Sequence, residues 1–181
     1  MKKLFFWIAI LVVIGGILYG LYYTAKRESE EDYGEFFELQ GRDHIEVGAT
    51  HDPYNSNPPS SGPHYGQPAQ TGIYDKAFPD EQLVHNLEHS HVWIAYQPAS
   101  ASAEMIDRLA EIAKTYKSKV IMTPRVANDA PIALVAWQRV LKLQTLDENL
   151  INQFIRRYRG SAGPVEERLI PDSGFKDFRG Q

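Results

Sequence analysis

The sequence predicts an α+β or α/β domain in which helices pack on a small sheet, preceded by one transmembrane helix at the amino terminus. Three observations predict this architecture. Residues 4–23 form an apolar run without a charged side chain, about the length that crosses a bilayer. The remaining chain, about 150 residues, suits one domain. From residue 91 onward the patterns run strand, helix, strand, strand, helix, which is compatible with a thioredoxin-like or ferredoxin-like core.

The apolar run is expected to be an uncleaved anchor. Its exit, LYYTAKRE, lacks the small-x-small pattern of a cleavage site, and the run is longer than a usual signal core. Lys2 and Lys3 before it resemble the start of an export signal, so we expect the rest of the chain outside the cytoplasm, with residues 4–23 in the lipid bilayer of the cell membrane. The predicted division is an anchor over 1–26, a charged linker over 27–35, a globular domain over 36–160 and a carboxy-terminal extension over 161–181.

Composition excludes several functions. Residues 28–181 contain all 23 acidic residues but only 15 of the 19 basic ones, a formal charge of −8. Such a balance argues against nucleic acid as a partner. The chain has no cysteine, which excludes disulfides, thiol redox chemistry and cysteine zinc sites.

The second half carries the clearest periodic patterns. A helix is predicted over 80–89, where Asp80 and Glu81 occupy the first turn. A strand, HVWIAYQ, follows, and Ser100 or Ser102 caps the next helix. The remaining predictions are a strand over 119–123, a second strand IALVAWQRVLKL, a helix that begins at Asp147 and ends at Gly160, and an extension beyond it without clear periodicity.

A loop rich in Pro, Gly, Ser and Asn occupies residues 48–75, which can form neither a helix nor a central strand. Tyr54, Tyr65, Ile73 and Tyr74 nevertheless give it side chains to bury, and long ordered loops are uncommon without a function. Its PPSSGPHY motif restricts the backbone before His64, which lowers the cost of holding that imidazole in place. The alternative is a simple turn over 60–62.

Histidines concentrate in the stretch LVHNLEHSHVWIAY, residues 83–96. His85 and His89 stand four apart, so on a helix their imidazoles leave the same face, and in an extended chain they would also point to one side. Glu88 lies between them, whereas the HExxH motif of zinc proteases has its acid at the second position. The alternative is a pair of ordinary hydrogen-bonded histidines.

Three segments together resemble the DUF3105 family, a bacterial and archaeal domain of unknown function. They are PPSSGPHY at 58–65, HNLEHSHVWIAY at 85–96, and AWQR at 136–139 preceded by PIAL. The family pattern is PPTSGPHY, HNLEHG and TAWGR, so this chain departs from it at Ser60, Ser90, Val135 and Gln138. The Ser90 departure replaces a glycine that would end the helix with a positive φ. The resemblance covers roughly residues 40–160 and implies no established activity.

The resemblance favours one shared site over separate structural histidines. The expected metal ligands are His64, His85 and His89, with His44 as a further candidate and Met122 as the thioether candidate. His51 and His91 are weaker candidates. A strand methionine such as Met122 is more often a core residue. Imidazoles suit zinc or copper, and a thioether favours copper(I), so the expected cofactor is a copper or zinc ion.

Three functional classes follow from these ligands. The leading hypothesis is a membrane-anchored, extracytoplasmic domain that handles copper or zinc, with Glu88 as a ligand or as an acceptor for an imidazole N–H. The second is a metal-dependent hydrolase in which Glu88 is the general base. The third is an interaction or assembly module without metal, in which the histidines attach the proline-rich loop to the body of the domain.

Overall fold

The computed structural model describes residues 2–30, 32–172 and 174–180, and the chain divides into two compact units, 1–32 and 33–181. The first unit is the helix α1 (Lys2–Glu30), which continues into the segment predicted as a linker. Its stretch Phe5–Tyr23 has a mean hydropathy of 2.2 and is long and apolar enough to cross a membrane. An amino-terminal signal sequence would have the same character, so this helix is a signal sequence or an anchor.

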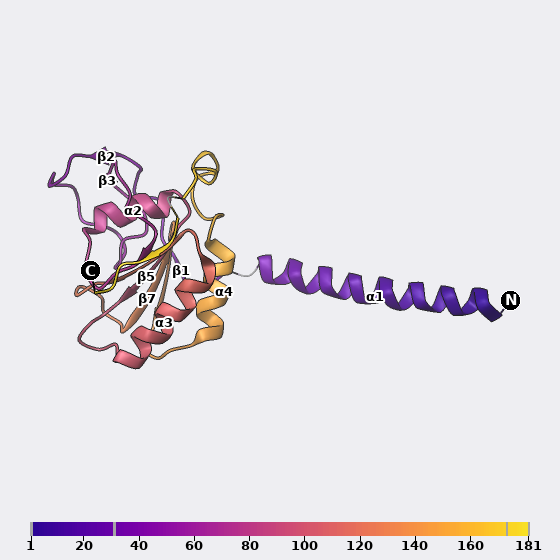
Figure 1. The fold of residues 1–181 in the computed structure, drawn as a ribbon. Helices are drawn as coiled ribbons and strands as arrows, with labels where there is room; N and C mark the ends of the chain where they lie inside the picture. Colours follow the sequence, from indigo (N-terminus) through magenta and orange to yellow (C-terminus); the bar gives the residue numbers. More distant parts are fainter. Residues whose placement is uncertain (1, 31, 173, 181) are drawn as a thin grey trace. The chain divides into compact units, whose positions relative to one another are not determined.

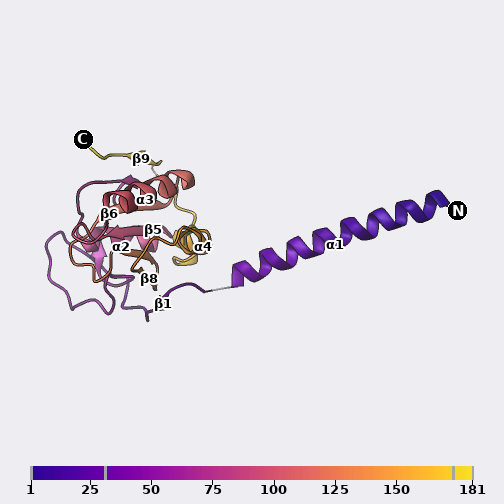
Figure 2. The same ribbon diagram turned by 90° about the horizontal axis from the view of Figure 1, so that it is seen from below.

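The second unit is built on a seven-stranded mixed sheet (Figures 1 and 2). Its strand order is β1-β8-β7-β5-β6-β4-β9, in which β5, β6, β4 and β9 are parallel neighbours and β5, β7, β8 and β1 are antiparallel neighbours. The strands are β1 (Glu35–Phe36), β4 (Gly72–Ile73), β5 (Val92–Tyr96), β6 (Val120–Pro124), β7 (Ile132–Ala136), β8 (Arg139–Leu143) and β9 (Lys176–Asp177). A separate parallel pair joins β2 (His44–Ile45) to β3 (His64–Tyr65).

The helices cover both faces of the large sheet. The helices α3 (Ala103–Tyr116) and α4 (Glu148–Tyr158) pack with Ile94, Met122 and Leu134 on one face. The helix α2 (Asp80–Glu88) packs through Leu83, Val84 and Leu87 with Trp93, Ile121 and Ala133 on the other face. Alternate residues of the strands therefore enter different cores. The sequence predicted helices packed on a sheet, and this mixed α/β arrangement confirms it.

Side chains fix where α3 and α4 begin. The hydroxyl of Ser102 accepts a hydrogen bond from the Met105 amide, and the carboxylate of Asp147 accepts one from the Leu150 amide. Each bond pairs an amide that has no partner within the helix. Both caps agree with the prediction.

The predicted strand IALVAWQRVLKL is wrong as a single element, because it is a hairpin of β7 and β8. The chain turns at Trp137 and Gln138, and Gln138 has a φ of 61°. Ser90, which follows α2, has the same φ of 61°. These are the two positions at which the resemblance described above implies glycine, the residue that adopts this conformation at least cost.

The predicted carboxy-terminal extension is integrated into the fold. The strand β9 pairs with β4, and Phe178 stacks on Tyr74 with ring centroids 4.6 Å apart. Nearer to α4, a short 3-10 helix, η1 (Val165–Glu167), follows the close approach of Gly163 to the end of α2. A methyl group on Gly163 would lie 2.0 Å from the Glu88 carbonyl oxygen. The segment 161–172 is called the strap below.

Candidate metal centre

Pairing of β2 with β3 brings two distant histidines together. The register aligns His44 with His64, and the His64 amide donates to the Asp43 carbonyl at 3.0 Å. Aligned residues of neighbouring strands project to the same side of a sheet. The two ring centroids are consequently 4.9 Å apart. His64 is fully buried, whereas the side chain of His44 is 57% exposed.

The helix α2 supplies the other members of the cluster. Its apolar face anchors it to the sheet, and His85 and Glu88, three residues apart, project toward β2 and β3. The ring of His85 lies 5.1 Å from that of His44 and 5.2 Å from that of His64. The rings of three histidines, His44, His64 and His85, therefore lie together.

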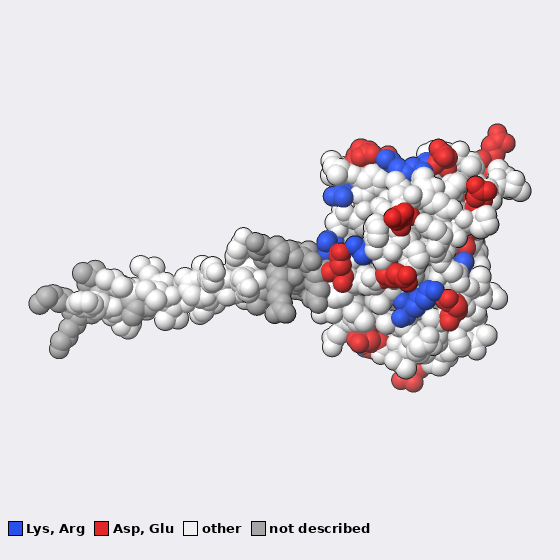
Figure 3. Space-filling model, turned by 180° about the vertical axis from the view of Figure 1, so that it is seen from behind, with Lys and Arg blue, Asp and Glu red and all other residues white. Residues whose placement is uncertain are grey.

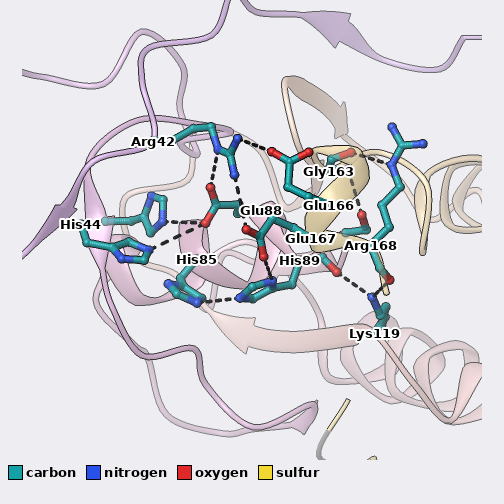
Figure 4. Close-up of polar contacts among 12 residues, drawn as sticks. Arg42, His44, His85, Glu88, His89, Lys119, Gly163, Glu166, Glu167 and Arg168 are labelled. Atoms are coloured by element: carbon teal, nitrogen blue, oxygen red, sulfur yellow. Dashed lines mark hydrogen bonds and ion pairs between the residues drawn. The ribbon is translucent and has the colours of Figure 1, made fainter. Parts of the chain in front are cut away.

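These four side chains have the spacing of a metal site (Figure 4). One ligand atom from each of His44, His64, His85 and Glu88 lies within 4.8 Å of all the others. Glu88 Oε2 is 3.1 Å from His64 Nε2 and 3.8 Å from His44 Nε2. Tetrahedral bonds of about 2.0–2.1 Å separate neighbouring ligand atoms by roughly 3.3 Å, so small shifts would complete such a site.

Backbone carbonyls fix the tautomers of the two buried imidazoles. His64 Nδ1 lies 2.7 Å from the Gly62 oxygen, and His85 Nδ1 lies 2.7 Å from the Tyr65 oxygen. A carbonyl oxygen only accepts, so each Nδ1 carries a proton and donates it. Each ring then turns its other nitrogen, Nε2, away from the carbonyl, that of His64 toward Glu88 Oε2 and that of His85 toward His89. Metal-binding histidines are typically held in this way.

The model of one protein family, described as Protein of unknown function (DUF3105), matches residues 46–173. The chain belongs to the DUF3105 family. No curated protein and no solved structure matched it. The match to DUF3105 includes His64, His85 and Glu88, while His44 precedes it by two residues. The family membership predicted from the three motifs is thus confirmed.

His89 lies beside the cluster rather than within it. Its Nε2 is 2.8 Å from His85 Nε2, and since His85 donates through Nδ1, the shared proton belongs to His89. His89 Nδ1 is 3.1 Å from Glu167 Oε2 in the strap, but this buried nitrogen makes no hydrogen bond. Burial lowers the pKa of His89, and this effect exceeds the opposite effect of the Glu167 and Glu88 carboxylates, which raise it.

Met122 is not brought to the histidines. It is fully buried in the core between the sheet and the helices α3 and α4, whereas α2 packs on the opposite face. The two weaker candidates also lie elsewhere in the fold. His51 is 3.3 Å from Glu81, and His91 shares a hydrogen bond with the Thr71 hydroxyl at 3.0 Å.

Sequence reasoning missed three charged residues around the cluster. Arg42 Nε donates to Glu88 Oε1 at 2.6 Å, and its other nitrogens lie 2.8 Å from Glu166 and 3.5 Å from Glu167 (Figure 4). One signal was available, because Arg42 precedes His44 by two residues and so faces the same side of an extended chain. Nothing comparable in the sequence pointed to the two glutamates.

The surroundings favour the deprotonated forms of Glu88 and His85. Burial raises the pKa of Glu88, but the hydrogen bond from Arg42 and the charges of His64 and Arg42 outweigh it, so this pKa lies below its ordinary value. Burial lowers the pKa of His85 to about 4, with a further contribution from neighbouring His89. At neutral pH the cluster therefore offers a carboxylate and a neutral His85 imidazole, the forms that bind metal ions.

We expect the metal-free protein to lose stability as the pH falls from about 7 to 4. The pKa values of His85 and His91 are lowered to about 4, and that of His89 is lowered too. Below the ordinary value near 6.5 the unfolded chain binds protons that the folded chain excludes, so acid favours unfolding until the folded pKa is reached. Near-ultraviolet circular dichroism melts of the full chain in detergent measure this. A Tm that stays constant between about pH 7 and 5 would contradict it.

Proposed function

We propose that this chain is a metal-binding protein that holds one divalent ion of the first transition row through His44, His64, His85 and Glu88. The observation that carries the proposal is the pair of backbone carbonyls that orient the two buried imidazoles. With Nδ1 held by a carbonyl, each ring turns its Nε2 inward, that of His64 to 3.1 Å from Glu88 Oε2 and that of His85 to 2.8 Å from His89 Nε2. A cation at the centre of the cluster could take both Nε2 atoms and Glu88 Oε2 as ligands.

The donor set favours zinc, with copper(II) as the competing ion. Three imidazole nitrogens and one carboxylate oxygen are common zinc ligands. The argument for copper(I) depended on a thioether, and Met122 lies in the core on the other face of the sheet. Copper(II) binds most nitrogen and oxygen sites more tightly than zinc, so the supply of metal rather than affinity would decide which ion is carried.

His89 supports the same proposal as an additional nitrogen. Its Nε2 lies 2.8 Å from that of His85 and could bind the ion if its proton moved to Nδ1, which faces Glu167 Oε2 at 3.1 Å. We infer that His89, which is buried, and His44, which is exposed, are alternatives for the last coordination position.

We propose that α1 is an uncleaved anchor and that the DUF3105 domain lies outside the cytoplasm. The apolar stretch Phe5–Tyr23 and the missing cleavage pattern support this proposal. The full chain should then stay in the membrane pellet after alkaline extraction, at its unprocessed mass. A shortened chain in the soluble fraction would indicate a cleaved signal sequence.

The hydrolase alternative has less support. A general base must be free to accept a proton, whereas Glu88 is bound by Arg42 and has a lowered pKa. Glu88 therefore suits a ligand better than a base.

For the core, we propose a thioredoxin-like rather than a ferredoxin-like fold. A ferredoxin-like fold follows the order β-α-β-β-α-β, whereas here three strands, β6, β7 and β8, follow one another between α3 and α4. Because the chain has no cysteine, this likeness carries no thiol chemistry.

The deciding experiment is a metal titration of the full chain in detergent micelles, without a histidine tag. We expect about one Zn²⁺ or Cu²⁺ per chain, with sub-micromolar affinity by calorimetry and a rise in Tm on loading. Elemental analysis after dialysis gives the stoichiometry. Failure to retain any of these ions above a blank micelle control would refute metal binding and favour the interaction module.

A further inference from the structure

The two carboxylate oxygens of Glu88 have different partners, Arg42 for Oε1 and the histidines for Oε2. Its Nε holds Oε1 at 2.6 Å, which leaves Oε2 facing His64 and His44. A charge-assisted bond of this length is stronger than a neutral one. Oε1 is thus engaged by Arg42, and Oε2 is the oxygen that faces the imidazoles (Figure 4).

The strap holds Arg42 in this position. Glu166 Oε1 lies 2.8 Å from Arg42 Nη1, and Glu167 Oε1 lies 3.5 Å from Nη2. The strap is itself fixed to the body of the domain, because the Gly163 amide donates to the Ser90 hydroxyl and Lys119 donates to the Arg168 carbonyl. Two segments that flank the cluster, around residue 42 and over 161–172, therefore meet at one guanidinium.

We propose that Arg42 is a positioning residue that restricts Glu88 to a single metal–oxygen bond and thereby limits the ion to four protein ligands. The inference rests on the proposed metal site and adds its coordination number. Without Arg42, both carboxylate oxygens would be free to bind, as carboxylates do where nothing occupies the second oxygen. A fifth donor atom would convert a tetrahedral site into a five-coordinate one.

Charge explains why a cation next to the metal is tolerated. A guanidinium so close to Glu88 would repel a bound ion if it stood alone. Glu166 and Glu167 neutralise it, and the three carboxylates with Arg42 carry a net charge of −2. This charge matches one divalent ion. On the face drawn in Figure 3, acidic and basic side chains are interspersed.

Cobalt(II) gives a direct readout, because four-coordinate Co²⁺ absorbs visible light strongly and higher coordination weakens the absorption. The full chain in detergent micelles is loaded with Co²⁺ alone, and the wild type should show the intense spectrum. Arg42→Gln should bind Co²⁺ with a spectrum several-fold weaker. Arg42→Lys, which retains a cation beside Oε1, should restore most of the intensity.

Two further variants separate positioning from folding. The double variant Glu166→Gln with Glu167→Gln keeps Arg42, so it should retain the intense spectrum but bind roughly 10–100-fold more weakly, as loss of outer partners typically does. Arg108→Gln breaks an arginine–glutamate pair far from the cluster and should match the wild type. An unchanged spectrum in Arg42→Gln overturns this inference alone. A wild type that binds no cobalt, zinc or copper overturns both this inference and the proposed function.

Discussion

Replacing His64 or His85 by alanine is expected to weaken metal binding by more than a hundredfold. Structural zinc sites bind with about 10–16 kcal/mol, so one of four ligands contributes about 3 kcal/mol, which is roughly two orders of magnitude in Kd. Both imidazoles are buried and oriented by backbone carbonyls, so solvent would not readily supply an equivalent donor. Calorimetry with Zn²⁺ measures the change.

The exposed member of the cluster should matter less. His44→Ala removes a side chain that is 57% exposed, so water or neighbouring His89 is expected to replace it, at a cost of about tenfold. His51→Ala is the matched control, because His51 contacts Glu81 outside the cluster. Equal loss of affinity in His51→Ala and His64→Ala, or equal loss of Tm with and without metal, would contradict a shared metal centre.

Gly163→Ala is expected to lower both stability and metal affinity. The new methyl group would lie 2.0 Å from the Glu88 carbonyl oxygen and 2.7 Å from Ser90 Oγ. Backbone atoms cannot make room cheaply, so either the strap or the end of α2 must move. Overpacking of this kind costs roughly 1–3 kcal/mol, a Tm loss of about 2–12 °C for a domain of this size.

Metal affinity reports the second effect of that substitution. If the strap moves away, Glu166 and Glu167 no longer hold Arg42, and we expect Zn²⁺ to bind roughly tenfold more weakly. Gly66→Ala is the matched control, because its methyl group would meet His44 Nδ1 at an ordinary 3.9 Å. An unchanged Tm in Gly163→Ala would show that α2 and the strap are not packed as described.

Local signals predicted the helices α2, α3 and α4 of the domain. The helix α2 ends one residue from its predicted limit, and the caps at Ser102 and Asp147 are where the sequence placed them. Helical spacing paired His85 with His89, and the stiff loop limited the freedom of His64, both of which are properties of neighbouring residues. Only the resemblance to DUF3105 suggested that His64 and His85 share a site.

Met122 illustrates a limit of strand patterns. The strand VIMTP has both faces covered, so alternation between apolar and polar residues is absent and the sequence does not reveal which face each residue takes. The structure assigns Ile121 to the α2 side and Met122 to the other. One step along the strand decides whether a thioether can reach the histidines.

The strap and the hairpin escaped prediction for different reasons. In the strap, the charged residues Glu166 and Glu167 contact Arg42, whereas the apolar Leu169 is 89% exposed. Charged residues are usually the exposed ones and apolar residues the buried ones. In the hairpin, Gln138 takes a positive φ without the glycine or asparagine that normally marks such a turn. Tertiary contacts, rather than local preference, determine both.

The alignment of β2 with β3 would let a bound ion stabilise this cysteine-free chain as a cross-link. An ion held by His44, His64 and His85 would cross-link three points separated by 20 and 21 residues. Closing loops of this length restricts the unfolded chain much as a disulfide does, by about 3 kcal/mol each in the entropic account. A chelator would therefore act on this domain as a reducing agent acts on a small secreted protein, loosening the proline-rich segment first.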